Sequence, residues 1–395
     1  MKGRALLLGI LLIAAVLLPS AASEKRSIEE LREEADAVLG LVEVSARGRI
    51  DVVFELADRL KEAGQTEEAL HYYETALRNN PWALNYQLAF AELLKEQGSE
   101  ELAQERLRIV SDYAEQDELV VKARHLLGED VDISVPPIGR IEDKEHAVVF
   151  VPLGEVDILL VKEVAQALEK ELGIPVVLQE VEMRLPPPGR GPLKEMLHQL
   201  RYWLKAREDR EQVQGLLAER ALSLDDLEDD YQALLDFYKA LAERSHGKEA
   251  AEQFSELVDQ LSGRSQWDAD ELLNVLKASV RDYAQEGVVH IGITGKDVYA
   301  RDYNFLFGWT RRGAGVLSYS RFTAEFTGET PNRDRLGDRI LKQSFSSTGL
   351  AFGIPRCSNP TCPRAYPHSL SEHDAKSTKL CDACKEGFRQ KFGQE

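Results

Sequence analysis

The sequence predicts a multidomain protein in which an all-α helical-repeat region precedes an α+β domain with a cysteine-rich end. Three observations lead to this prediction. Apolar residues between positions 50 and 110 recur at helical spacing in two successive frames of equal length. From position 145 onward, apolar runs of strand length alternate with stretches of helical periodicity. All four cysteines of the chain lie between positions 357 and 384.

Length and charge limit the classes of protein to consider. The chain has 395 residues, which is too long for one typical domain. Its hydrophobic fraction of 43% and charged fraction of 30% are those of a globular protein. The net charge is -19, so the surface repels phosphate backbones. We therefore expect no nucleic-acid partner.

The segment 1–23 has the pattern of a signal peptide. Lys2 and Arg4 precede an apolar run from Ala5 to Leu18, and small residues follow up to Ser23. The run is short for a membrane span. We expect an exported protein, located in the periplasm or outside the cell. A membrane is a partner only if an uncleaved signal segment anchors the chain.

Residues 24–131 are predicted to be helical. Ser27 and Glu30 form an S-x-x-E capping box that starts the first helix. From Ile50 the chain resembles tetratricopeptide repeats, hairpins of two helices with a period of about 34 residues. The first frame places Leu56, Ala57, Leu60, Gly64, Ala69, Tyr73, Ala76 and Pro81 on the expected positions, and the second places Phe90, Ala91, Leu94, Gly98, Ala103, Leu107 and Val110. The resemblance implies a concave surface that binds a protein or peptide ligand, and the alternative is a spacer.

Residues 132–144 are predicted to be a linker, because Pro136, Pro137 and Gly139 interrupt any periodicity. The domain at 145–395 then opens with a β-α-β pattern. The predicted elements are a strand at 147–152, a helix at about 156–172, a strand at 175–182, a helical stretch at 191–264, a helix at 266–283, a strand at 288–295, a strand at 304–308, a strand at 316–322 and a helix at about 334–352.

The four cysteines have the spacing of a metal site. Cys357 and Cys362 form a C-x4-C pair, and Cys381 and Cys384 form a C-x2-C pair. Four thiolates at this spacing suit one structural Zn²⁺. Two disulfides are the alternative, because an exported chain meets an oxidising compartment.

The residues around these cysteines resemble a known family. The stretch from Lys342 reads KQSFSSTGLAFGIPRC, and Cys357 ends it. It resembles the archaemetzincins, zinc metallopeptidases whose signature is H-E-x-x-H-x-x-G-x-x-H-C followed by C-x4-C and C-x-x-C. The likeness covers roughly 145–184 and 266–388, so residues 191–264 are interpreted as a helical insertion. The glycines at 349 and 353 and all four cysteines match the family.

The catalytic half of the signature is missing. The resemblance places the three zinc histidines on Ser346, Leu350 and Arg356, and the general-base glutamate on Ser347. Arg364 replaces the methionine that lies beneath the family's metal. Serine is a poor ligand, leucine cannot ligate, arginine repels a cation, and serine is a weak base. A metal rebuilt elsewhere, for example near His368 and His373, and a serine nucleophile are the alternatives.

These observations predict an exported, catalytically inactive archaemetzincin-like protein with one structural zinc ion. A peptide would bind by strand addition along Asn304, Phe305, Leu306 and Phe307, which resemble the strand beside the family's substrate cleft. Asp297 and Arg321 are expected to line that cleft or to form a salt bridge. A zinc-dependent metallopeptidase with a relocated metal site is the alternative function.

Overall fold

The computed structural model describes residues 26–39, 47–142, 144–191, 193–194, 200, 210–248, 251, 254 and 263–393. The chain divides into two compact units. The described residues of the first unit, the α/β unit, lie between Ser134 and Phe322 and after Leu336. The second contains the preceding helices together with Thr323–Leu336. The boundary after Ile133 falls inside the predicted linker, whose described residues form only one isolated β-bridge, from Pro137 to Glu180.

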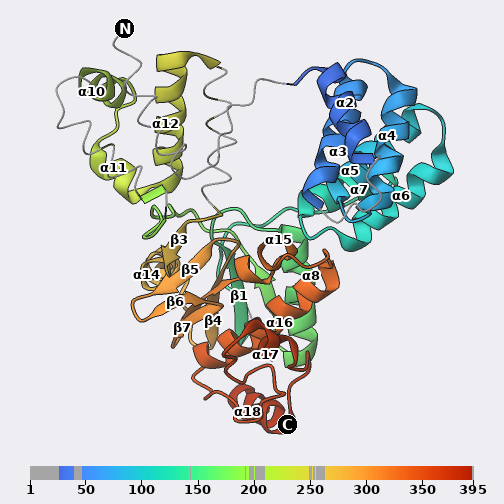
Figure 1. The fold of residues 1–395 in the computed structure, drawn as a ribbon. Helices are drawn as coiled ribbons and strands as arrows, with labels where there is room; N and C mark the ends of the chain where they lie inside the picture. The colour runs from blue at the N-terminus through green and yellow to red at the C-terminus, as the bar shows by residue number, and fades with distance from the viewer. Residues whose placement is uncertain are drawn as a thin grey trace. The chain divides into compact units, whose positions relative to one another are not determined.

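The second unit is built from helical hairpins (Figure 1). Its described helices are α2 (Ile28–Leu39), α3 (Arg47–Glu62), α4 (Thr66–Asn79), α5 (Leu84–Glu96), α6 (Glu100–Tyr113), α7 (Asp117–Leu126), α15 (Ala324–Thr327) and the start of α16 (Arg333–Ala351). The predicted capping box starts α2, with the backbone N–H of Glu30 donating to Ser27 Oγ over 3.2 Å and the N–H of Ser27 donating to Glu30 Oε2 over 2.8 Å.

The hairpins repeat with the spacing expected from the sequence. Helix α4 begins at Thr66 and α6 at Glu100, which agrees with a period of roughly 34 residues. The turn residues Gly64 and Gly98 have φ values of 74° and 75°, which only glycine adopts freely. Small residues of the repeat are fully buried, among them Ala57, so neighbouring helices can approach closely. The helical nature of this region is therefore as predicted.

Thr323–Leu336 belongs with this helical unit, whereas the sequence predicted that these residues are part of the domain at 145–395. Glu115 is 4% exposed, and its carboxylate accepts hydrogen bonds from the backbone N–H groups of Ala324 (2.6 Å) and Asn332 (3.2 Å). Arg333 donates to Asp117 over 2.9 Å, and both side chains are largely buried. These long-range contacts have no periodic signature, so the sequence could not reveal them.

The first unit contains two sheets. The larger has the order β2-β1-β4-β8-β7, and only β7 at its edge is antiparallel to its neighbour. The smaller has the order β3-β5-β6. The strands are β1 (Ala147–Pro152), β2 (Val176–Leu178), β3 (Gln266–Asp268), β4 (Val288–Thr294), β5 (Asp297–Ala300), β6 (Tyr303–Leu306), β7 (Gly308–Arg311) and β8 (Ala314–Ser318).

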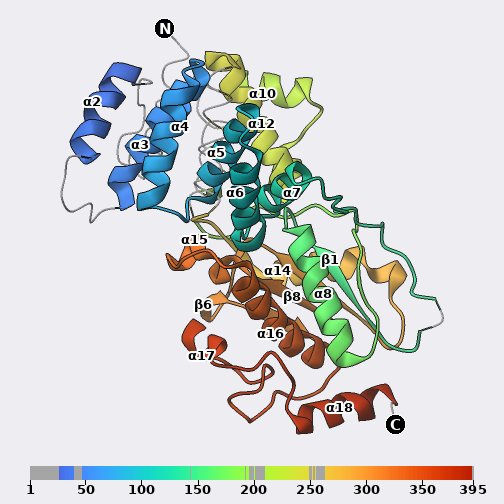
Figure 2. The same ribbon diagram turned by 90° about the vertical axis from the view of Figure 1, so that its right-hand side faces the viewer.

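Helices cover both faces of the larger sheet. The helices of this unit are α8 (Ile158–Leu172), α10 (Arg210–Glu219), α11 (Leu224–Asp229), α12 (Tyr231–His246), α14 (Ala269–Ser279), the part of α16 (Arg333–Ala351) that follows Leu336, α17 (Leu370–Asp374) and α18 (Asp382–Phe392). Helix α14 lies on one face, and α8 and α16 lie on the other (Figures 1 and 2). Strand β1 is buried almost throughout, as expected for a parallel strand covered on both faces. The predicted α+β class is corrected to α/β, because most strand pairs are parallel.

Several predicted boundaries need correction. Gln266–Asp268 is strand β3, and the helix begins only at Ala269, where Asp268 accepts hydrogen bonds from the N–H groups of Asp270 and Glu271. The strand expected at 316–322 spans Ala314–Ser318, and a 3-10 turn, Ser320–Phe322, follows it. The strand expected at 175–182 is limited to Val176–Leu178.

The predicted insertion at 191–264 contributes described helices α10, α11 and α12. Their apolar side chains belong to the same hydrophobic core as side chains of β1 and α14. The rings of Tyr231 and Trp267 meet edge to face, with 5.4 Å between their centres. This packing stabilises α12 against the domain. The signal-peptide prediction lies outside the described residues. In the part of the chain that the structure describes, no helix combines the length and apolar character needed to span a bilayer.

Candidate functional site

The four cysteines converge at the carboxyl end of the chain. Their Sγ atoms all lie within 4.8 Å of one another. The closest pairs are Cys357 with Cys381, at 3.6 Å, and Cys362 with Cys384, at 3.7 Å. A disulfide bond is only about 2.05 Å long, so these thiols are unbonded. The two disulfides left open by the sequence do not form in this structure.

This sulfur geometry fits zinc. A Zn–S bond of about 2.3 Å in a tetrahedral site places sulfur atoms about 3.8 Å apart. The two short separations are close to that value, and four cysteine sulfurs form a complete ligand set for a closed structural site. The cluster can therefore bind one zinc ion. Such an ion would hold together the loop from Cys357 to Cys362 and the start of α18, with no coordination position left for a substrate.

The thiols depend on a cation to ionise together. Burial raises the pKa of Cys357 and of Cys384 above the usual thiol value. Burial also raises the pKa of Cys381. Hydrogen bonds from the backbone N–H of Cys384 and from the neighbouring thiols outweigh this effect and bring the pKa of Cys381 below its usual value. Cys381 precedes α18, so the helix N-terminus favours its thiolate. A bound Zn²⁺ would stabilise all four thiolates at neutral pH.

Helix α16 carries Ser346 and Leu350, the positions on which the resemblance places the first two zinc ligands. Its apolar side chains are buried, with Ile340 and Phe345 fully enclosed. Polar side chains that share its surface are buried as well: Ser346 is 2% exposed and Ser347 is 1% exposed. Gln343 donates to Ser347 Oγ over 3.2 Å. A buried polar face of this kind is unusual for a helix that only fills a core.

The side chain of Arg356 lies against this polar face. Its Nη1 donates to Ser346 Oγ over 3.1 Å, so the positions that correspond to the first and third family ligands meet in space. Leu350, at the second ligand position, is half-buried one turn after Ser346. Burial lowers the pKa of Arg356, which the phenol of Tyr366 opposes and the charge of Arg364 reinforces. The guanidinium thus brings a positive charge to a position where the resemblance would require a neutral metal ligand.

Arg364 is a structural residue. It is 1% exposed and donates to the carbonyl oxygens of Ile354 (2.7 Å) and Pro355 (2.8 Å). Its Nη1 also lies 3.5 Å from Cys384 Sγ. A Cβ at Gly349 would approach the guanidinium to 2.4 Å, so this glycine makes room for it. Arg364 therefore connects α16 to the cysteine cluster.

The predicted peptide-binding edge lies on β6 and the residue after it. In the smaller sheet β6 pairs only with β5 among the described strands, and the carbonyl oxygen of Asn304 accepts a hydrogen bond from the side chain of Gln266. Tyr303 is 44% exposed and Phe305 is 36% exposed, while Asn304 is exposed and Leu306 and Phe307 are half-buried. The chain then returns as β7, where a Cβ at Gly308 would meet Gln343 and Ser347. The start of β7, two residues after β6, therefore lies next to Gln343 and Ser347 of α16.

His368 and His373 do not form a metal site with each other. His373 is fully buried, its Nε2 lies 2.9 Å from the carbonyl oxygen of Arg339, and its ring stacks on Phe322 at 4.9 Å. His368 is exposed on the preceding loop. Within the described residues, the cysteines form the only cluster of three or more metal-binding side chains.

Asp297 and Arg321 form the salt bridge that the sequence left as one of two alternatives. Arg321 donates from Nε and Nη2 to the two carboxylate oxygens, each over 2.8 Å, and Gln266 donates to Asp297 over 2.9 Å. The guanidinium also stacks on Phe305, with 4.2 Å between Cζ and the ring centre. The pair therefore supports the β6 edge.

The buried histidines predict a loss of stability in acid. Burial lowers the pKa of His290 to about 4, and burial with the charge of Lys376 lowers that of His373 to about 3. Below about pH 6.5 these two histidines bind protons in the unfolded chain but stay neutral in the folded chain. The free energy of unfolding therefore falls as the pH drops towards 4, by about 1.4 kcal/mol per pH unit for each histidine. Urea unfolding should show a shallower decline in His290→Gln than in the natural protein. Equal slopes would contradict the prediction, since zinc release affects both proteins alike.

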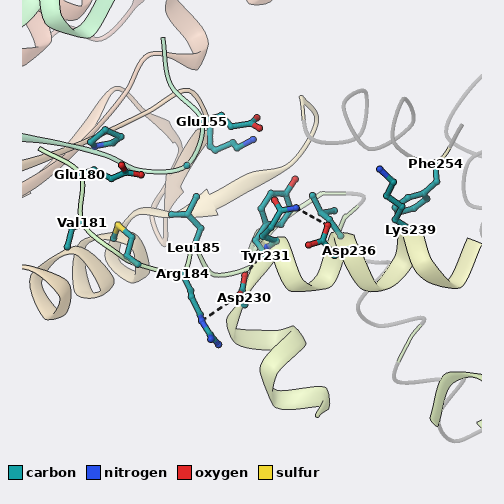
Figure 3. A pocket seen from close by; sticks show the side chains of 16 residues that line it. Glu155, Glu180, Val181, Arg184, Leu185, Asp230, Tyr231, Asp236, Lys239 and Phe254 are labelled. Carbon is teal, nitrogen blue, oxygen red and sulfur yellow. Dashed lines mark hydrogen bonds and ion pairs between the residues drawn. The ribbon is translucent and has the colours of Figure 1, made fainter. Parts of the chain in front are cut away.

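A cavity of about 570 Å³ lies elsewhere in this unit, at the carboxyl ends of β1 and β4 (Figure 3). Side chains from α12 line one side, where Arg184 pairs with Asp230 over 3.5 Å and Gln232 donates to Asp236 over 3.1 Å. None of its lining residues comes from α16, β6 or the cysteine cluster. The helical insertion thus borders a separate cavity, of which the sequence contains no indication.

Part of the chain is similar to known proteins. The model of Peptidase family M54 matches residues 252–390. The archaemetzincin of Pyrococcus furiosus is 35% identical over 133 residues, which are 33% of this chain and 68% of that protein. The chain belongs to the archaemetzincin family. A second archaemetzincin, from Pyrococcus horikoshii, is 33% identical over 123 residues, covering 31% of this chain and 64% of the relative.

Solved archaemetzincin structures are also similar. That of Methanopyrus kandleri has a TM-score of 0.37 and 18% identity, covering 64% of this chain and 98% of that one. That of Archaeoglobus fulgidus, a complex with malonate, has a TM-score of 0.34 and 17% identity, covering 61% and 98%. The chain thus spans about two thirds of the length of its curated archaemetzincin relatives.

Proposed function

We propose that this archaemetzincin holds extended peptides beside α16 without cutting them, and that its zinc ion is structural. The hydrogen bond from Arg356 to Ser346 carries the proposal, because it joins two positions at which the family motif has zinc ligands. A guanidinium repels a cation and cannot activate water. The remaining ligand position, Leu350, has no donor atom.

The β6 edge supports the binding half of the proposal. A strand edge offers backbone N–H and C=O groups to an added strand, and exposed aromatic side chains beside it offer apolar contacts. Tyr303 and Phe305 supply those contacts, and Arg321 with Asp297 holds the edge in place. The result is a peptide groove that needs no metal.

The helical unit supports a second, separate contact with a protein. Its repeat period and its positive-φ turn glycines match tetratricopeptide repeats, so we propose that it binds a protein or peptide ligand. The apolar run from Ala5 to Leu18 leads us to propose export, with the membrane as a partner only if that run is retained. Mass spectrometry of the protein isolated from cells would show whether segment 1–23 is removed.

Incubating the purified protein with casein and with a quenched fluorescent peptide tests the proposal. We expect no hydrolysis above that of the buffer, and saturable binding of the same peptide by fluorescence anisotropy. Hydrolysis that a chelator abolishes, and that survives replacement of Cys384, would instead establish the alternative of a metallopeptidase with a relocated metal site.

A further inference from the structure

The only large apolar side chains that are exposed in the described part of the α/β unit come from β6 and from the loop beside Arg356. Tyr303, Phe305 and Tyr366 are 44%, 36% and 46% exposed. The guanidinium of Arg356 lies over the Tyr366 ring, with 5.0 Å between Cζ and the ring centre. The exposed ring of Tyr366 therefore covers one side of the guanidinium.

Within the described residues, Arg356 has no acidic partner. Its side chain reaches the surface although its guanidinium is partly enclosed, and its one hydrogen bond to a described side chain goes to the neutral hydroxyl of Ser346. Among the described residues no carboxylate is paired with it, whereas Arg321 and Arg339 each have a bidentate aspartate partner. Three of the four nitrogen-bound hydrogens on its two terminal nitrogens are therefore available to a ligand.

The chemistry of this arrangement selects its ligand. A planar guanidinium binds a carboxylate through two parallel hydrogen bonds, and desolvation by neighbouring rings strengthens such charged bonds. The molecule as a whole has a net charge of -19, so a freely diffusing anion is favoured only at a local site of this kind. The edge of β6 would carry the chain that leads to the carboxylate.

We propose that Arg356, with the ring of Tyr366 against its guanidinium, is a carboxylate-binding site that captures the free C-terminus or an acidic side chain of the bound peptide. This inference rests on the proposed peptide-binding function and adds that the bound peptide carries a carboxylate at this site. The lost metal site has become an anion site, with the positive charge supplied by a side chain. The residue that prevents zinc binding is then the residue that selects the ligand.

Fluorescence anisotropy with one labelled Val/Thr peptide tests the inference. The peptide is used with a free C-terminus, as its C-terminal amide, and as an amide that contains one glutamate. We expect the free acid to bind about 10- to 100-fold more tightly than the plain amide, and Arg356→Gln to remove that difference. The glutamate-containing amide distinguishes an acidic side chain from a C-terminus as the source of the carboxylate.

Arg312→Gln is the matched control, because Arg312 is also exposed but lies in the turn between β7 and β8. It should leave the preference unchanged. Equal binding of all three peptides, unaffected by Arg356→Gln, would overturn the inference and leave peptide binding in place. Absence of binding by every peptide would overturn both. Hydrolysis of a peptide whose binding needs Arg356 would support the inference and refute the non-cutting function.

Discussion

Replacing Cys384 by serine is expected to release the zinc ion and unfold the cysteine-rich end of the chain. Structural zinc is worth on the order of 10 kcal/mol, which is as large as the stability of a whole domain. Cys384 is 6% exposed and lies in the first turn of α18, whose Phe388 and Phe392 pack together. Phe392 also contacts Phe352, at the end of α16. Loss of the ion should therefore loosen α16 as well.

The measurement is zinc content by mass spectrometry together with thermal unfolding. The natural protein should contain one zinc ion per chain, and Cys384→Ser none, with a transition lowered or split into two. Ser358→Ala is the control, because Ser358 is exposed beside Cys357 and provides no thiol. A Cys384→Ser variant with unchanged stability would show that the cluster does not hold the fold together.

Restoring the family ligands is expected to create a second metal site. The variant combines Ser346→His, Leu350→His and Arg356→His with Ser347→Glu. Residues 346 and 350 are one helical turn apart, and the contact between Arg356 and Ser346 shows that the third position reaches the same point. Removing the guanidinium takes away the positive charge and vacates space. Zinc content should rise from about one to about two ions per chain, with tight binding by three imidazoles.

The role of the glutamate can be separated from that of the histidines. A variant with the three histidines but with Ser347 unchanged should bind the second zinc and lack hydrolytic activity, because the general base is absent. Adding Ser347→Glu should give peptide hydrolysis that a chelator abolishes. A folded variant that still holds only one zinc ion would mean that these positions do not converge as the hydrogen bond indicates.

Regular elements with strong patterns were predictable from the sequence. Strand β1 and helix α16 both match their predicted ranges to within a residue, because an apolar strand and a helix ended by Gly353 and Pro355 have clear local signals. The close approach of the four cysteines also followed from their spacing. The mainly parallel sheet did not, since strand direction depends on connections rather than on local patterns.

Features that depend on distant contacts were not predictable. The grouping of Thr323–Leu336 with the helical unit rests on Glu115 and Asp117, which lie far earlier in the chain. His373 is in a polar stretch of the sequence, yet its side chain is fully buried and its ring stacks on Phe322, about 50 residues earlier in the chain. The motif alignment indicated that Arg356 would lie near Ser346, but only the structure shows that its guanidinium has no acidic partner among the described residues.

Counting metal ions in the natural protein by native mass spectrometry tests the central claim most directly. The account predicts one zinc ion per chain, and none after replacement of the cysteines. A second ion that remains bound when the cysteines are replaced would contradict it, because a metal would then be held away from the thiols and the chain could still be a peptidase.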